Sequence, residues 1–350
     1  MLALAVLATA LAGVLAVGYR GPLRLSLALA LPGAEGWLPG AEVTREEVSV
    51  AAREGHLAAD LYRPARPRGA ILLVHGLSTL GRRQPDLARL ALRLAREDRL
   101  VLVPQYPGLA AFRLEGAEVG TILASIDDLA RRPGATPLVV AGFSFGAGPA
   151  LLAAARRPGV RLAASFGGYA DLREVIAFVT TAPAAEPYNR WKLLSILGGL
   201  VGDTDERERL AAIAAARLAD PGSDTARLEA GLAGEGRAVL ALVSNERANA
   251  VPVLLAALPP AARRALDDLA ALPAAARLRG RLLIAHGRED VSIPYAESAR
   301  LAEAGGARAV ILETFHHTGP RPFLALVLPR ARDGARLVRI ADALLSARGL

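Results

Sequence analysis

The chain has 350 residues, of which 53% are apolar, so it can bury one large core or two modest ones. It contains no cysteine, which excludes disulfides, thiolate metal sites and cysteine nucleophiles. The net charge is +8, but the arginines are spread along the chain, Lys192 is the one lysine, and aromatic residues make up only 4%. This pattern indicates a compositional bias and predicts no nucleic-acid partner.

The N-terminal 40 residues differ from the rest of the chain. Leu2 to Val17 form an apolar run without a charge, and a partly apolar tract from Leu23 to Leu31 follows, interrupted by Arg24. The run lacks the positive start of a signal peptide and is slightly shorter than the roughly 20 residues that span a bilayer. We interpret residues 1–40 as a membrane anchor and linker, with the body held at a membrane. A cleaved signal peptide of an exported protein and a buried core helix are the alternatives.

Strands and helices then alternate. Val43 to Pro64 reads as two antiparallel strands around the turn at Glu54-Gly55, with His56 as an exposed strand residue. Short apolar runs typical of buried parallel strands alternate with amphipathic stretches typical of helices. The expected strands are Ala70–Val74, Leu100–Val103, Leu138–Ala141 and Val160–Ser165, and the expected helices are Asp86–Ala95, Val119–Leu129 and Gly146–Ala155. The pattern predicts an α/β fold with a doubly wound, mostly parallel sheet, whose first part spans residues 41–170.

After Asp171 the alternation stops for roughly 100 residues, which is far longer than the usual connections of such folds. We expect a mainly helical cap insertion over residues 171–278. The alternation returns over residues 279–350, which form the second part of the core. The expected elements there are strands Arg281–Ala285 and Ala309–Glu313 and helices Ala296–Ala304 and Phe323–Leu345.

One turn contains a motif that is typical of a catalytic serine. Gly142-Phe143-Ser144-Phe145-Gly146 lies between an expected strand and an expected helix, which is the context that the G-x-S-x-G pattern requires. The flanking glycines lack the Cβ atoms that would collide in so sharp a turn, so the hydroxyl of Ser144 projects from the sheet. The amide of Phe145, at the start of the helix, can face an oxyanion. A glycine-rich turn without chemistry is the alternative interpretation.

A serine nucleophile needs a base and a carboxylate that orients the base. Asp290 follows one late strand and His317 follows the next, so both would emerge with Ser144 at the carboxyl edge of one sheet. In these residues the chain resembles the α/β-hydrolase superfamily. The motifs that carry the resemblance are Leu73-Val74-His75-Gly76, the G-x-S-x-G turn, His286-Gly287-Arg288-Glu289-Asp290-Val291-Ser292-Ile293-Pro294 and His316-His317.

The resemblance implies that Ser144 is the nucleophile, His317 the general base and Asp290 the orienting carboxylate, with the amides of Phe145 and Leu77 in the oxyanion hole. His316 is the alternative base. Asp171, which follows the strand after the nucleophile, is the alternative acid. Glu289 is disfavoured because neighbouring loop residues point apart, and His75 and His286 are expected to be structural.

The resemblance also implies a carboxylesterase-like serine hydrolase that needs no metal and no organic cofactor. Its expected partner is a small-molecule or lipid-like ester that the cap would help to bind, together with the membrane through the N-terminal segment. Thioesterase, peptidase and acyltransferase activities use the same triad. A catalytically silent, membrane-tethered binding protein is an alternative of another class, and no feature predicts the oligomeric state.

Overall fold

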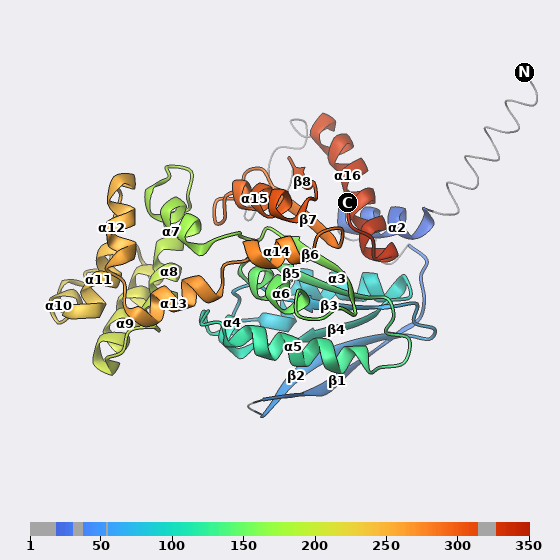
Figure 1. The fold of residues 1–350 in the computed structure, drawn as a ribbon, viewed down its shortest axis with the longest axis horizontal. Coiled ribbons are helices and arrows are strands. Elements are labelled where there is room, and N and C mark those ends of the chain that lie inside the picture. The colour runs from blue at the N-terminus through green and yellow to red at the C-terminus, as the bar shows by residue number, and fades with distance from the viewer. Residues whose placement is uncertain (1–18, 31–37, 54, 314–326) are drawn as a thin grey trace, which may run out of the picture.

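The computed structural model describes residues 19–30, 38–53, 55–313 and 327–350 (Figure 1). Within these residues, eight strands form one sheet in the order β1-β2-β4-β3-β5-β6-β7-β8. β1 and β2 are antiparallel to each other, β2 is antiparallel to β4, and the remaining neighbours are parallel. This confirms the predicted doubly wound, mostly parallel sheet. The strands are β1 (Val43–Ala52), β2 (Gly55–Pro64), β3 (Ala70–Val74), β4 (Leu100–Pro104), β5 (Leu138–Phe143), β6 (Val160–Phe166), β7 (Leu282–Gly287) and β8 (Ala309–Leu312).

Helices cover both faces of the sheet, which explains why the central strands are apolar throughout. Alternate residues of β3 point to opposite sides: Leu72 joins one buried cluster, while Ile71 and Leu73 join the other. The first cluster includes side chains of α5, α6 and α15, and the second includes side chains of α3 and α16. These helices are α3 (Pro85–Arg96), α5 (Ala117–Ala130), α6 (Ala147–Ala154), α15 (Tyr295–Gly305) and α16 (Val327–Ser346).

Helix α2 (Arg20–Ala30) packs against α16 and so belongs to the folded body (Figure 1). Leu25 is buried in the same cluster as Ile340 and Leu344, and Arg24 Nε donates a 2.8 Å hydrogen bond to Glu97 Oε1. The helix has 11 residues, about 16 Å at 1.5 Å per residue, or roughly half of a bilayer core. The side of α2 that carries Leu25 and Ala28 is covered by protein, whereas Leu23 and Leu27 are exposed.

The prediction of a membrane anchor over residues 1–40 is therefore corrected, and with it the membrane location and the membrane partner. No helix in the described part of the chain is long and apolar enough to cross a bilayer. Most of the partly apolar tract from Leu23 to Leu31, which contributed to that prediction, lies in α2. The apolar run Leu2 to Val17 lies outside the described residues.

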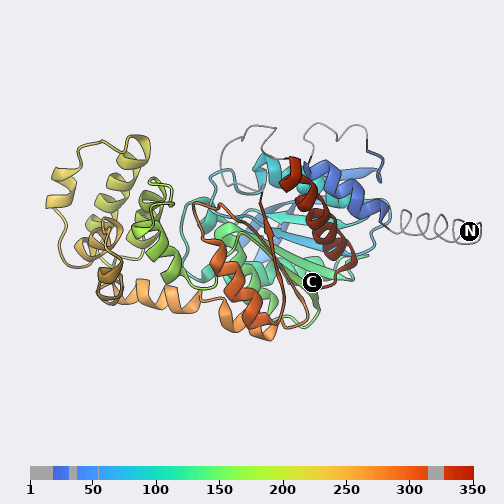
Figure 2. The same cartoon turned by 90° about the horizontal axis from the view of Figure 1, so that it is seen from above.

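Most of the segment between β6 and β7 is helical and extends away from the sheet (Figures 1 and 2). α7 and α11 pack on α8, and α8 packs on α9. α14, at the end of the segment, packs instead against the core helices α6 and α15. The helices are α7 (Leu172–Thr181), α8 (Asn189–Gly198), α9 (Thr204–Ala219), α10 (Ala226–Ala230), α11 (Gly234–Val243), α12 (Val251–Ala256), α13 (Pro260–Asp268) and α14 (Leu272–Arg277).

Candidate active site

Ser144 lies at the sharp turn between β5 and α6. Its backbone is left-handed, with φ of 51°, a conformation that costs a non-glycine residue about 1–3 kcal/mol and that collects at functional sites. The glycines on either side make the turn possible. A Cβ atom at Gly142 would lie 2.7 Å from the Cβ of Ala150, and one at Gly146 would collide with the carbonyl of His75. The local geometry is that of a nucleophile elbow.

The loop after β3 runs beside this serine. A Cβ atom at Gly76 would lie 2.9 Å from the Cβ of Ser144, so only a glycine lets the loop approach so closely. His75, which precedes it, is buried and bonds at both ring nitrogens. Nε2 accepts a 3.1 Å hydrogen bond from the Tyr106 amide, so Nδ1 carries the proton and donates to the Gly76 carbonyl at 2.8 Å. Burial lowers the pKa of His75, in keeping with this neutral ring.

The same loop is fixed further along by a buried ion pair, which the sequence analysis missed. Arg82 in the short helix η2 (Gly81–Arg83) is 5% exposed, and its Nη1 lies 2.5 Å from Oδ1 of Asp60 on β2. Its Nη2 donates to Glu47 at 2.6 Å, and its amide donates to Gln105 Oε1 at 2.9 Å. The segment that carries Leu77 is therefore held at both ends, by His75 and by Arg82.

Asp290 lies in the loop after β7, and its side chain is 6% exposed. Oδ1 accepts hydrogen bonds from the amides of Ser292 and Ile293 at 2.8 and 2.9 Å. His286 Nε2 lies 3.4 Å from Oδ2 and donates to the Ile293 carbonyl at 2.9 Å, while its Nδ1 accepts from the Ser298 hydroxyl at 2.7 Å. A Cβ at Gly167 would lie 3.6 Å from Oδ2, which places the carboxylate beside the turn that follows β6. The loop thus presents Asp290 in one fixed orientation.

Asp171, the alternative acid, occupies the N-cap position of α7. Its Oδ1 accepts a 2.9 Å hydrogen bond from the Arg173 amide, the usual role of an aspartate at a helix start. Its own amide donates to Glu297 Oε2 at 2.8 Å, as does the amide of Ala170 at 2.9 Å. Glu297 is 2% exposed and anchors this loop, but in the sequence it looks like any polar residue of an amphipathic helix.

His316 and His317, the two candidate bases, lie outside the described residues. β8 ends at Leu312, and its parallel pairing with β7 places its carboxyl end beside the loop that carries Asp290. In the part of the chain that the structure describes, no group of three or more histidine, aspartate or glutamate side chains is arranged to hold a metal ion. The structure thus brings the loops of Ser144, Gly76 and Asp290 to one edge of the sheet.

No protein-family model and no curated protein sequence matches the chain. Solved structures do match. The 2,6-dihydroxy-pseudo-oxynicotine hydrolase has 15% identity and a TM-score of 0.51, and the match covers 89% of this chain and 70% of that one. The α/β-hydrolase GrgF from Penicillium sp. sh18 has 14% identity and a TM-score of 0.51, with 87% and 99% covered.

An acylaminoacyl peptidase from Pyrococcus horikoshii also matches, at 13% identity and a TM-score of 0.50. The match covers 89% of this chain but 43% of the peptidase, so the chain spans less than half of that protein's length. At such identities the likeness establishes the fold and leaves the substrate open. Together with the sheet order and the elbow, these matches show that the chain has the α/β-hydrolase fold.

Proposed function

We propose that the protein is a serine hydrolase that cleaves carboxylic esters through an acyl-enzyme. The observation that carries this proposal is the left-handed backbone of Ser144 at the end of β5, with the Gly76 loop packed against it. A strained serine at the carboxyl edge of a parallel sheet is a costly arrangement for a purely structural turn. Open α/β sheets bind their ligands at the carboxyl edge, and this supports the same proposal.

In this proposal Ser144 Oγ attacks the ester carbonyl carbon while His317 takes its proton. The resulting oxyanion would accept hydrogen bonds from the amides of Phe145 and Leu77. Phe145 is the second residue of the short helix η3 (Ser144–Gly146), and amides in a first helical turn have no partner within the helix. His317 then gives the proton to the departing alcohol, and a water molecule, activated in the same way, hydrolyses the acyl-enzyme.

Asp290 is proposed to orient the base. Two backbone amides hold its Oδ1, and this fixes the plane of the carboxylate and directs Oδ2 toward the turn after β6. A buried carboxylate in a fixed orientation is suited to accept the hydrogen bond that sets the tautomer of a catalytic histidine.

Labelling with a fluorophosphonate probe tests this proposal. We expect the wild-type protein to be labelled and Ser144→Ala not to be, whereas Ser244→Ala, which changes an exposed serine of the cap segment, should be labelled normally. The wild-type protein and Ser244→Ala should also hydrolyse p-nitrophenyl esters of increasing chain length, whereas Ser144→Ala should not. Matched thioester and anilide substrates then report which acyl compound is preferred. Labelling of Ser144→Ala would show that another residue is the nucleophile. A folded wild-type protein that is not labelled and hydrolyses none of these esters would favour the alternative of a binding protein.

A further inference from the structure

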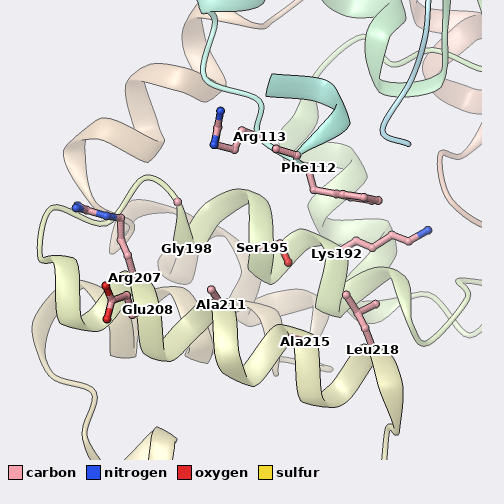
Figure 3. A pocket seen from close by; sticks show the side chains of 12 residues that line it. Phe112, Arg113, Lys192, Ser195, Gly198, Arg207, Glu208, Ala211, Ala215 and Leu218 are labelled. Carbon is pink, nitrogen blue, oxygen red and sulfur yellow. The ribbon is translucent and has the colours of Figure 1, made fainter. Parts of the chain in front are cut away.

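A cavity of about 460 Å³ lies between the core and the helices that follow β6 (Figure 3). On the core side it is bounded by residues 111–113, in the turn after α4 (Pro107–Ala110), and on the other side by α8 and α9. This is the size range of pockets that hold small organic ligands. Its wall is mostly apolar, and small residues leave the space open. The lining residues are Ala111, Phe112, Arg113, Lys192, Ser195, Gly198, Gly199, Arg207, Glu208, Ala211, Ala215 and Leu218.

Phe112 is held over this cavity in a strained conformation. Its φ is 54°, in the left-handed region that bulky residues avoid. The turn is closed by a 2.8 Å hydrogen bond from the Arg113 amide to the Gly108 carbonyl, and the ring of Phe112 extends above Lys192 (Figure 3). Strained residues of this kind cluster at functional sites, and here the ring of Phe112 forms one wall of a space large enough for a ligand.

Lys192 brings a positive charge to one end of the cavity. Its side chain is half-buried, and its ammonium lies 4.2 Å from the centroid of the Tyr188 ring. Burial lowers the pKa of Lys192, and the negative charge of Glu186 opposes this shift without forming an ion pair within 4.0 Å. A cation that is partly withdrawn from water, with its carboxylate neighbour beyond ion-pair distance, is stabilised by a ligand that supplies a closer negative charge.

The two arginines that line the cavity are already engaged, and the carboxylate in its lining lies away from Lys192. Arg207 donates hydrogen bonds to the carbonyls of Val201 and Gly202 at 2.8 and 2.7 Å, so its guanidinium is already bonded to the main chain. Arg113 lies 3.7 Å from the exposed Glu115. Glu208 points from the end of the cavity opposite to Lys192 (Figure 3).

The cavity is also tied to the loop of Asp290. The Glu186 amide donates to the Val291 carbonyl at 3.1 Å, and Asn189 Nδ2 donates to the Ser292 hydroxyl at 3.0 Å. The start of α8 is therefore bonded to the acid loop, and Lys192 follows Asn189 by about one helical turn. The helix that carries Lys192 is thus connected to the loop of Asp290 by two hydrogen bonds.

We propose that this cavity binds an apolar chain that ends in a carboxylate, with Lys192 as the residue that selects the negative charge. The predicted substrates are accordingly half-esters of dicarboxylic acids or esters of similar amphipathic anions. The substrate role rests on the proposed hydrolase function, whereas binding of the anionic chain does not.

Calorimetric titration of the Ser144→Ala protein tests binding without turnover. Monomethyl suberate should bind roughly tenfold more tightly than the neutral dimethyl suberate, the gain expected of one partly desolvated ion pair. Lys192→Met in the same background should remove this difference, and Lys192→Arg should retain most of it. Arg227→Met, which removes an exposed charge from α10, controls for net charge. Equal binding of the two ligands, or a preference that survives Lys192→Met, would overturn the proposal.

Kinetics with intact Ser144 separate this inference from the proposed function. We expect p-nitrophenyl hemisuberate to be preferred over p-nitrophenyl octanoate through a lower KM, and Lys192→Met to abolish that preference. Hydrolysis without a charge preference would sustain the hydrolase and overturn the cavity's role. Selective binding without hydrolysis would support the cavity's role and overturn the proposed hydrolase function.

Discussion

Gly76 and Ser144 pack so closely that a Cβ atom at residue 76 would lie 2.9 Å from the Cβ of Ser144 and 3.0 Å from the carbonyl oxygen of Phe143. The loop after β3 therefore approaches the serine with bare backbone. Backbone amides are the usual donors of an oxyanion hole, and they can serve only where no side chain intervenes. The contact links the position of Leu77 to that of Ser144.

A methyl group at residue 76 should thus damage activity more than stability. We expect Gly76→Ala to lower kcat/KM for p-nitrophenyl acetate by about 100-fold or more, the loss seen when one oxyanion donor is displaced. The cost in stability should be about 1–3 kcal/mol, as for other overpacked sites. Gly120→Ala is the matched control, because a Cβ there meets nothing within 4 Å. Normal turnover by Gly76→Ala would show that this loop does not position a donor.

The two candidate acids can be distinguished with isosteric variants. Asp290→Asn should lower kcat by about three to four orders of magnitude, because an amide cannot hold the base in its required tautomer. Asp171→Asn should keep activity within roughly tenfold, and its stability should change little because asparagine is also a good N-cap. Purified variants are compared with the same ester after circular dichroism has shown that both are folded. The opposite ranking would make Asp171 the orienting carboxylate.

Several features of this fold could be predicted because they depend on residues that lie close together in the sequence. β3 was predicted with its observed ends, Ala70 and Val74, because burial on both faces makes every residue apolar. The elbow was likewise predicted, since Gly142 and Gly146 are required by contacts that any sharp strand-to-helix turn creates. His75 was expected to be structural, and its two hydrogen bonds agree.

Other features depend on contacts between distant parts of the chain. The tract that contains α2 was assigned to the membrane because an apolar face looks the same in the sequence whether lipid or α16 covers it. The cavity needs Phe112 and Lys192, 80 positions apart in the numbering, to line the same space. The pairing of Arg82 with Asp60 has no local signal either. Such relationships arise only when the chain packs.

The choice between the two adjacent histidines remains a prediction from the sequence. We expect His317→Ala to lose several orders of magnitude in turnover, because the base takes the proton of Ser144. His316→Ala should lose roughly tenfold or less if its side chain only packs. Both are measured as purified, folded proteins on one ester. A nearly inactive His316→Ala beside an active His317→Ala would transfer the role to His316.

The buried ring of His75 should make the stability of the protein sensitive to acid. Burial lowers the pKa of His75 below its ordinary 6.5, so the unfolded chain binds a proton there more readily than the folded protein. This contribution to stability is complete above about pH 6.5 and is lost as the pH falls toward the lower pKa of the folded state. Urea unfolding at pH 8, 7, 6 and 5 should show a decline in the wild type that is shallower in His75→Gln, whereas His56→Gln, an exposed residue of β2, should follow the wild type. Parallel curves for wild type and His75→Gln would mean that the ring is not held neutral by the Tyr106 amide.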